Sequence, residues 1–272
     1  MKKNEICLLG SSGDFYTKAV IKEFKERGLK FDLIIVKNNS NTSKYSKWIQ
    51  RIISILNDLY SGKYTALSKW SFFTYQEYIR QFLFYRTLTY KKLTESYIDL
   101  DTDKYSSLFV SSINHVKVRS FILQNEYKIG VFAGVGIVHK DIIESFSECC
   151  LNAHPAPLPE CRGAGALQQT LYKKLKPSAS VHYATPDVDA GGILDLEPLE
   201  LRQDDTLETI SFKLTLLCAV RLAYVSERMV SGGYFEVAVN HGEIHFWRDC
   251  TKEIQRSARK NLKELLSKLN GA

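Results

Sequence analysis

The first 36 residues contain a strand, turn, helix and strand pattern that restricts the fold of the whole chain. An apolar run, EICLLG, ends at Gly10, and a helical pattern with apolar residues on one side continues to Gly28. The run FDLIIV, residues 31–36, has the length of a buried strand rather than of a helix. Two strands joined in this way form a βαβ unit, in which the strands are parallel. We therefore predict an α/β fold with a Rossmann-like, mostly parallel sheet and helices on both faces.

Composition excludes several other classes of protein. The 272 residues are 44% hydrophobic and 25% charged, with 15 Gly and 6 Pro, unlike collagen-like, low-complexity or disordered chains. The run at 129–138 is too short for a bilayer span, which needs about 20 residues, and the apolar run after MKK is too short for a signal peptide. Six scattered cysteines without a CxxC pair favour buried thiols in a reducing compartment. We expect a cytoplasmic protein with no membrane partner.

The alternation of strands and helices is interrupted between residues 41 and 95. This stretch carries nine Lys and Arg against three Asp and Glu, so it supplies +6 of the formal charge of +7. It also contains thirteen aromatic residues, no Pro and one Gly. The apolar spacing indicates two or three inserted helices. Three interpretations are open: a helical insert with a solvated basic face, a wall for an anionic small substrate, or an RNA-binding surface.

Regular α/β structure is expected to resume after this helical insertion, at about residues 41–105. Helices are predicted over 116–125, 139–147, 166–175 and 206–230, and strands over 107–113, 129–138 and 178–185. Two alternating runs around Asn240-His241-Gly242 predict a small C-terminal β-hairpin, followed by a basic amphipathic helix over 252–269. We divide the chain into a main domain, residues 1–230, and an appendage, residues 231–272. The appendage is expected either to cover the sheet or to form a homodimer interface.

Asn152 and His154 are two residues apart at the end of a predicted strand. The period of a strand places both side chains on one face. Pro155, Pro157 and Pro159 prevent the strand from continuing. An amide and an imidazole are thus predicted at the carboxyl end of a strand, where open α/β sheets bind ligands. A strand end capped without a ligand is the alternative interpretation of this short pattern.

A carboxylate and a second imidazole are predicted nearby. Asp189 lies in a glycine-rich loop after a strand that carries His182. An amide and an imidazole can donate hydrogen bonds to a developing oxyanion, and the imidazole can also move a proton. A carboxylate can orient the imidazole and raise its pKa. No Ser or Cys nucleophile is evident among these residues, so the set suits acyl transfer in which the substrate, typically an amine, is the nucleophile.

The segment from Leu151 to Leu201 contains N-x-H-P, L-P, R-G, S-V-H and D-x-G-x-I-L in this order. It resembles the folate-dependent formyltransferase family, which includes glycinamide ribonucleotide, methionyl-tRNA and nucleotide-sugar formyltransferases. Weaker similarity extends from the LLGSSG turn to about residue 230, so the resemblance makes residues 1–230 a catalytic domain. It implies that Asn152 and His154 stabilise the oxyanion, and that Asp189 completes the catalytic set by holding His154. His182 is implied in a supporting role.

The resemblance also implies the ligands. The donor would be N10-formyltetrahydrofolate, a co-substrate, and no metal is expected, because the adjacent Cys149 and Cys150 lack the spacing of zinc ligands. The implied folate contacts are Ala133, Gly134, Val135, Ile137, Val138, Thr185, Pro186, Asp187 and Val188. The implied acceptor contacts are Gly10, Ser11, Ser12, Gly13, Arg162 and Gly163.

The turn at 10–13 opens a helix, whose N–H groups can hold an anion. In the ribonucleotide-using relatives the equivalent turn binds the substrate phosphate. Because the turn lacks the GxGxxG pattern, a dinucleotide site is not expected. A tight turn without a ligand is the alternative.

Chain length guides the prediction of the acceptor. The purine enzyme is shorter and lacks a long aromatic insert, the tRNA enzyme carries a larger C-terminal domain, and the folate hydrolase relative carries an N-terminal regulatory domain. We therefore expect a nucleotide-diphosphate-linked amino sugar, a precursor of cell-surface glycans. Its phosphates suit the basic insert, and its base suits the aromatic residues. The alternatives are the purine acceptor phosphoribosylglycinamide, a methionyl-tRNA-like acceptor, and a non-catalytic folate or nucleotide-sugar binder.

Overall fold

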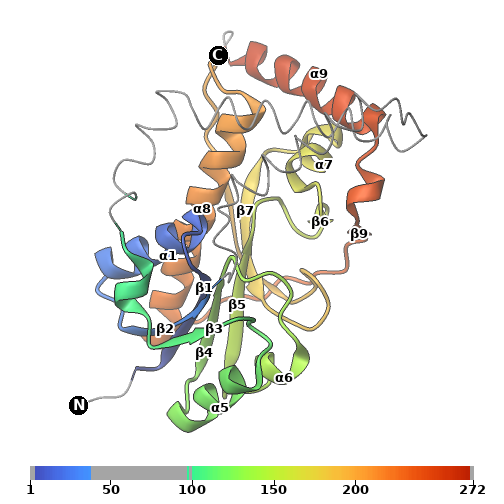
Figure 1. The fold of residues 1–272 in the computed structure, drawn as a ribbon. Helices are drawn as coiled ribbons and strands as arrows, with labels where there is room; N and C mark the ends of the chain where they lie inside the picture. The colour runs from blue at the N-terminus through green and yellow to red at the C-terminus, as the bar shows by residue number, and fades with distance from the viewer. Residues whose placement is uncertain (1–3, 38–96, 98–99, 270–272) are drawn as a thin grey trace, which may run out of the picture. The chain divides into compact units, whose positions relative to one another are not determined.

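The computed structural model describes residues 4–37, 97 and 100–269 (Figure 1). The chain separates into two compact units, one of Met1–Lys37 with Tyr97–Ala272 and one of Asn38–Ser96. The predicted basic and aromatic insert, 41–95, lies outside the described residues. The helical insertion was predicted to extend to about residue 105, and its last residues form the short 3₁₀ helix η1 (Thr102–Tyr105). The following description concerns the first unit.

A seven-stranded sheet with the order β3-β2-β1-β4-β5-β7-β8 forms the centre of this unit. Its strands are β1 (Ile6–Ser11), β2 (Phe31–Val36), β3 (Leu108–Val110), β4 (Ile129–Ala133), β5 (Cys149–His154), β7 (Ser178–Tyr183) and β8 (Ile193–Pro198). The first five are parallel, whereas β7 and β8 are antiparallel to their neighbours. The predicted Rossmann-like, mostly parallel sheet is confirmed. Strand β8 is not among the predicted strands.

Helices cover both faces of the sheet (Figure 1). The helices of the described residues are α1 (Phe15–Glu26), α5 (Val116–Asn125), α6 (Lys140–Ile143), α7 (Ala166–Tyr172), α8 (Leu207–Val230) and α9 (Lys252–Lys268), with a 3₁₀ turn, η2 (Trp247–Asp249). Of these, α1 and α8 lie on one face of the sheet and α5 and α6 on the other. Ile6 and Leu8 of β1 belong to the hydrophobic cluster with α1 and α8. Cys7 and Leu9 belong to the cluster with α5 and α6. The alternating side chains of β1 thus divide the core into two layers, as a sheet covered on both faces requires.

Helix α8 is the most apolar helix that the structure describes at length. The helix has 24 residues, and an 18-residue window within it has a mean hydropathy of 1.4, so its length and composition would suit a membrane span. Half of this window is buried inside the protein. Leu222 and Ala223 are fully buried against the sheet, and Thr206 caps the first turn with a capping box. Packing on the sheet accounts for the apolar character of this helix.

The predicted C-terminal hairpin is wrong. Ala238 instead forms an isolated antiparallel bridge with Ile193 at the start of β8. Residues Ile244–His245 form β9, which pairs in parallel with β6 (Arg162–Gly163). The alternating pattern indicated extended backbone but not its partner, because the unpaired groups of other strands compete for the same hydrogen bonds. The helix predicted after the hairpin is confirmed as α9, which packs with α7 and the start of α8.

Strands β1 and β4 lie side by side at the point where the strand order reverses. In open α/β sheets this is the usual place for a ligand. Here Thr17 joins the two strand ends: its hydroxyl donates to the Ala133 carbonyl at 2.6 Å and accepts from the Ser11 N–H at 3.0 Å. Beyond Ala133 the predicted strand at 129–138 ends, because Gly134 and Gly136 adopt positive φ angles of 84° and 76°. The hydrogen bonds of the Thr17 side chain therefore join the ends of β1 and β4 at the point where the strand order reverses.

We predict that Thr17→Val lowers the free energy of unfolding by about 1–3 kcal/mol, because the Ser11 N–H and the Ala133 carbonyl lose their partner in a buried place. Urea denaturation measures the change. Thr170 is equally buried and provides a control, since its hydroxyl donates to a carbonyl within its own helix, Ala166. Thr170→Val should have the smaller effect, and equal losses would contradict the role assigned to Thr17.

Candidate active site

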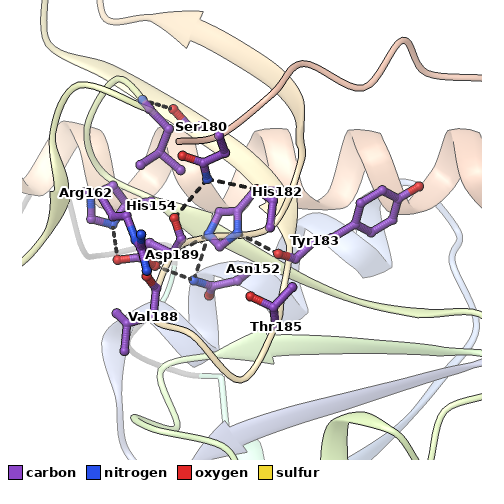
Figure 2. Close-up of polar contacts among 12 residues, drawn as sticks. Asn152, His154, Arg162, Ser180, His182, Tyr183, Thr185, Val188 and Asp189 are labelled. Atoms are coloured by element: carbon purple, nitrogen blue, oxygen red, sulfur yellow. Dashed lines mark hydrogen bonds and ion pairs between the residues drawn. The ribbon is translucent and has the colours of Figure 1, made fainter. Parts of the chain in front are cut away.

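Strand pairing brings the amide and both imidazoles together. Asn152 and His154 lie on one face of β5, and the antiparallel register pairs Asn152 directly with His182 of β7. The Nδ2 atom of Asn152 lies 3.3 Å from Nε2 of His182 (Figure 2). Period-2 alternation predicts the first two positions. The position of His182 depends on β7 being the antiparallel neighbour of β5, which no local pattern indicates.

Asp189 reaches these residues from the loop after β7. Its Oδ2 atom lies 3.3 Å from Nδ1 of His154, and its Oδ1 atom lies 3.4 Å from Nδ2 of Asn152 and 3.5 Å from Nε2 of His182 (Figure 2). The backbone N–H of Gly163 also hydrogen-bonds to this carboxylate. Because only 11% of the Asp189 side chain is exposed, a buried negative charge is compensated mainly by these groups.

Two backbone carbonyls determine which histidine nitrogens carry hydrogen. His154 Nε2 lies 2.8 Å from the carbonyl of Cys161, and His182 Nδ1 lies 2.8 Å from the carbonyl of Tyr183. A carbonyl can only accept, so we assign a hydrogen to each of these nitrogens. With its hydrogen at Nδ1, His182 can accept at Nε2 from the Asn152 amide. A proton taken up by His154 lies at Nδ1, directly against Asp189.

Burial lowers the pKa of His154 below its usual 6.5, although the charge of Asp189 and the hydrogen bond to Cys161 act in the opposite direction. Burial by itself would raise the pKa of Asp189. The interactions of this carboxylate with His182, His154 and the backbone of Gly163 outweigh burial, so its pKa is lowered. Near neutral pH the site therefore contains an uncharged His154 next to a carboxylate. This pair can accept a proton at Nδ1 and stabilise the resulting charge.

We predict that His154 titrates below pH 6.5 in an NMR titration of the imidazole protons, because burial dominates its environment. Asp189→Asn should lower the pKa further, since the attractive carboxylate charge is lost while the ring stays buried. A native His154 that titrates above 6.5, or a pKa that rises in the variant, would contradict this balance of effects.

The first loop predicted to contact folate follows β4. Ala133 and Val138 are buried, Val135 is half-buried, and Ile137 is 71% exposed. Asn114 holds this loop from both sides: its Nδ2 donates to the Ile137 carbonyl at 3.0 Å, and its Oδ1 accepts from the His139 N–H at 2.8 Å. The sequence offered no signal for Asn114, because a single polar residue after a strand is typical of any turn.

The second predicted folate loop follows β7. Ala184, at its start, packs on the same hydrophobic cluster as Val135 and Val138, so the two loops share a base. The Thr185 hydroxyl donates to the Asp187 carbonyl at 3.0 Å, Pro186 is exposed, and Val188 is 41% exposed. Exposed apolar side chains beside the polar array suit a flat ring system. Folate contact by these residues stays a prediction.

The turn at residues 10–13 uses most of its N–H groups within the protein. The Ser11 N–H donates to Thr17, the Ser12 N–H to the Val36 carbonyl, and the Asp14 N–H to the Ser11 carbonyl. The carboxylate of Asp14 caps α1 by accepting from the backbone N–H groups of Tyr16 and Thr17. The carboxylate of Asp14 thus already uses two of the N–H groups at the start of α1 that could otherwise hold a phosphate. Other substrate contacts by Gly10, Ser11, Ser12 and Gly13 stay a prediction.

Arg162 and Gly163 in β6 contact the Asp189 loop. Arg162 Nε donates to the Val188 carbonyl at 2.6 Å, and Nη1 donates to the Gly242 carbonyl at 3.2 Å. The backbone N–H of Gly163 hydrogen-bonds to the Asp189 carboxylate. Arg162 and Gly163, both predicted to contact the acceptor, therefore also stabilise the Asp189 loop. Contact with a substrate stays a prediction for these two residues.

Metal chemistry receives no support from the described part of the chain. Within residues 4–37, 97 and 100–269, no group of three His, Cys, Asp or Glu side chains has the arrangement of a metal site. All six cysteines, Cys149 and Cys150 among them, are free.

Comparison with known proteins agrees with this geometry. Residues 123–217, which include the whole polar array, match the model of the family described as formyl transferase. The match covers less than half of the chain, and over this segment the chain is similar to the formyl transferases. A methionyl-tRNA formyltransferase from Hydrogenobaculum sp. (strain Y04AAS1) is 30% identical over 118 residues, which are 43% of this chain and 39% of that protein. The chain thus spans about two fifths of the length of this relative.

Solved structures with the same fold include sugar N-formyltransferases. The enzyme from Shewanella sp. FDAARGOS_354 has a TM-score of 0.56 and 12% identity, covering 94% of this chain and 87% of that one. An N-formyltransferase from Helicobacter canadensis, solved in complex with folinic acid and dTDP-3-aminofucose, has a TM-score of 0.53 and 10% identity, covering 96% and 80%. The fold is that of the formyltransferases.

Proposed function

We propose that this protein transfers a formyl group from N10-formyltetrahydrofolate to a primary amine of a nucleotide-linked amino sugar. The observation that carries the proposal is the contact of buried His154 with the half-buried Asn152 and the largely buried Asp189 inside the formyl transferase match. Cys161, a buried residue whose carbonyl lies 2.8 Å from Nε2 of His154, supports direct attack by the substrate rather than by a thiol. Burial raises the pKa of this thiol, which disfavours the thiolate that a cysteine nucleophile needs.

In the proposed reaction the amine nitrogen attacks the formyl carbon and forms a tetrahedral intermediate. Asn152 and His154 donate hydrogen bonds to the oxyanion, and to do so each exchanges a donor that the protein now uses: Asn152 the one on His182 or Asp189, and His154 the one on the Cys161 carbonyl. The bond between the carbon and N10 then breaks, and the products are a formamide and tetrahydrofolate. His154 carries the proton released by the amine toward the departing N10, while Asp189 stabilises the protonated imidazole.

The folate donor is supported by the two loops that share a hydrophobic base beside the array. It is also supported by the Helicobacter canadensis structure, which contains folinic acid. The amino-sugar acceptor is supported by the sugar N-formyltransferases among the structures with the same fold. The capped turn before α1 disfavours the phosphate position of the ribonucleotide-using relatives. We therefore prefer the sugar acceptor to the purine acceptor.

The function is tested by incubating the protein with N10-formyltetrahydrofolate and a panel of amines. The panel contains UDP- and dTDP-linked amino sugars, glycinamide ribonucleotide and charged methionyl-tRNA, and mass spectrometry detects the N-formyl product. We expect product from a nucleotide-linked amino sugar. Product from glycinamide ribonucleotide alone would overturn the acceptor, and binding without any product would favour the non-catalytic binder.

We predict that Asn152→Ala and His154→Ala each lower turnover by about 10²-fold or more, because each removes a donor to the oxyanion. Circular dichroism and thermal unfolding check that both variants fold. Asn125→Ala and His115→Ala serve as matched controls, since these two residues hold the end and the start of α5. Both controls should keep near-native turnover. Near-native activity in the two site variants would show that the site assignment is wrong.

A further inference from the structure

We infer that residues 238–245 are part of the active site and that Asn240 is a positioning residue for Asp189. We call residues 238–245 the C-terminal clamp. The catalytic consequence rests on the proposed function, whereas the structural consequence does not. The alternating sequence of this segment does not indicate that it contacts the Asp189 loop.

Asn240 is buried, with 6% of its surface exposed. Its Nδ2 atom donates to the carbonyl of Asp189 at 2.9 Å and to the carbonyl of Gly191 at 2.8 Å. Both amide hydrogens are therefore used on the loop that carries the carboxylate. This pairing also determines the orientation of the amide, because a flipped side chain would turn Oδ1 against two carbonyl oxygens.

The Asp189 loop needs such a partner. Asp189 itself has a φ angle of 48°, in the left-handed region that residues with a side chain seldom adopt. The carbonyls of Asp189 and Gly191 point toward the clamp rather than into a helix or a strand ladder. Buried carbonyls without a partner destabilise the conformation that contains them. The amide of Asn240 removes this penalty and thereby favours the backbone that directs the carboxylate at His154.

Further contacts attach the clamp on both sides of Asn240. Ala238 and Ile193 exchange two backbone hydrogen bonds of 2.9 Å just after the loop. Arg162 bridges the carbonyls of Val188, just before Asp189, and Gly242. The loop is thus connected to the clamp before, at and after Asp189.

The clamp also lies against the proline-rich loop after β5. Gly242 packs so closely on Pro159 that an added Cβ would overlap the Pro159 carbonyl. That loop leads to Cys161, whose carbonyl determines the hydrogen position on His154. The clamp therefore touches the two segments that orient the acid and the base, although none of its contacts in the structure is to the imidazole itself.

The decisive variant is Asn240→Ala in the full-length protein. Asn261→Ala is the matched control, because Asn261 Nδ2 also donates to two backbone carbonyls, Leu171 at 2.9 Å and Tyr172 at 3.2 Å, at the end of α7. We expect backbone hydrogen exchange of residues 185–192 to rise about tenfold or more in Asn240→Ala, because local opening of the loop becomes easier. Exchange of these residues should stay native in Asn261→Ala.

Kinetics provide the second readout. In Asn240→Ala we expect kcat to fall on the order of tenfold, with KM for the acceptor within about twofold, since misplacing a catalytic group weakens the transition state more than substrate binding. The control should keep both parameters within about twofold. A fall in thermal stability shared by both variants would not produce this split.

Native exchange of residues 185–192 in Asn240→Ala would overturn the inference, whatever the activity. Absence of formyl transfer by the native protein would instead overturn the proposed function and leave the exchange result valid. If Asn240→Ala fails to fold, the same exchange measurement is made on Asn240→Ser, whose side chain retains one hydrogen-bond donor. Raised exchange of the loop in Asn240→Ser supports the clamp, and native exchange overturns it.

Discussion

The buried carboxylate of Asp189 is the constraint on which the rest of the site depends. A negative charge that is only 11% exposed needs hydrogen bonds and positive charge around it. The partners come from three separate elements: the amide and imidazole of β5, the imidazole of β7 and a backbone N–H of β6. The same groups that stabilise the charge also define the geometry proposed for catalysis.

The reversal of chain direction at β7 makes this arrangement possible. Residues 155–177, which include β6 and α7, connect β5 to β7, and β7 enters the sheet antiparallel to β5. With β7 antiparallel, His182 lies directly opposite Asn152. The loop after β7 can then return to β5 within a few residues, and β8 follows as a second antiparallel strand. The antiparallel edge therefore concentrates polar groups from distant parts of the chain on one strand end.

The sequence predicted features that depend on local periodicity. The strands of the first βαβ unit, the helix at 116–125 and the helix predicted at 252–269 agree with the structure within one residue at their ends. The pairing of Asn152 with His154 on one face follows from the same rule. Features that depend on a distant partner could not be predicted in this way. Strand β8, the partners of the C-terminal segment, and the amides of Asn114 and Asn240 are of this kind, because register and partner are set by tertiary contacts.

Two places in the sheet, the β1–β4 pair and the β5–β7 pair, differ in which hydrogen-bond donors are available to a ligand. At the β1–β4 end, Thr17 and Asp14 use the donors that a helix start would offer to a phosphate. At the β5–β7 end, the donors surround a carboxylate whose partners can exchange a proton. A helix N-terminus attracts an anion only while its N–H groups are available. The start of α1 is therefore less available to an anion, whereas the groups around β5 can exchange the proton that the proposed reaction requires.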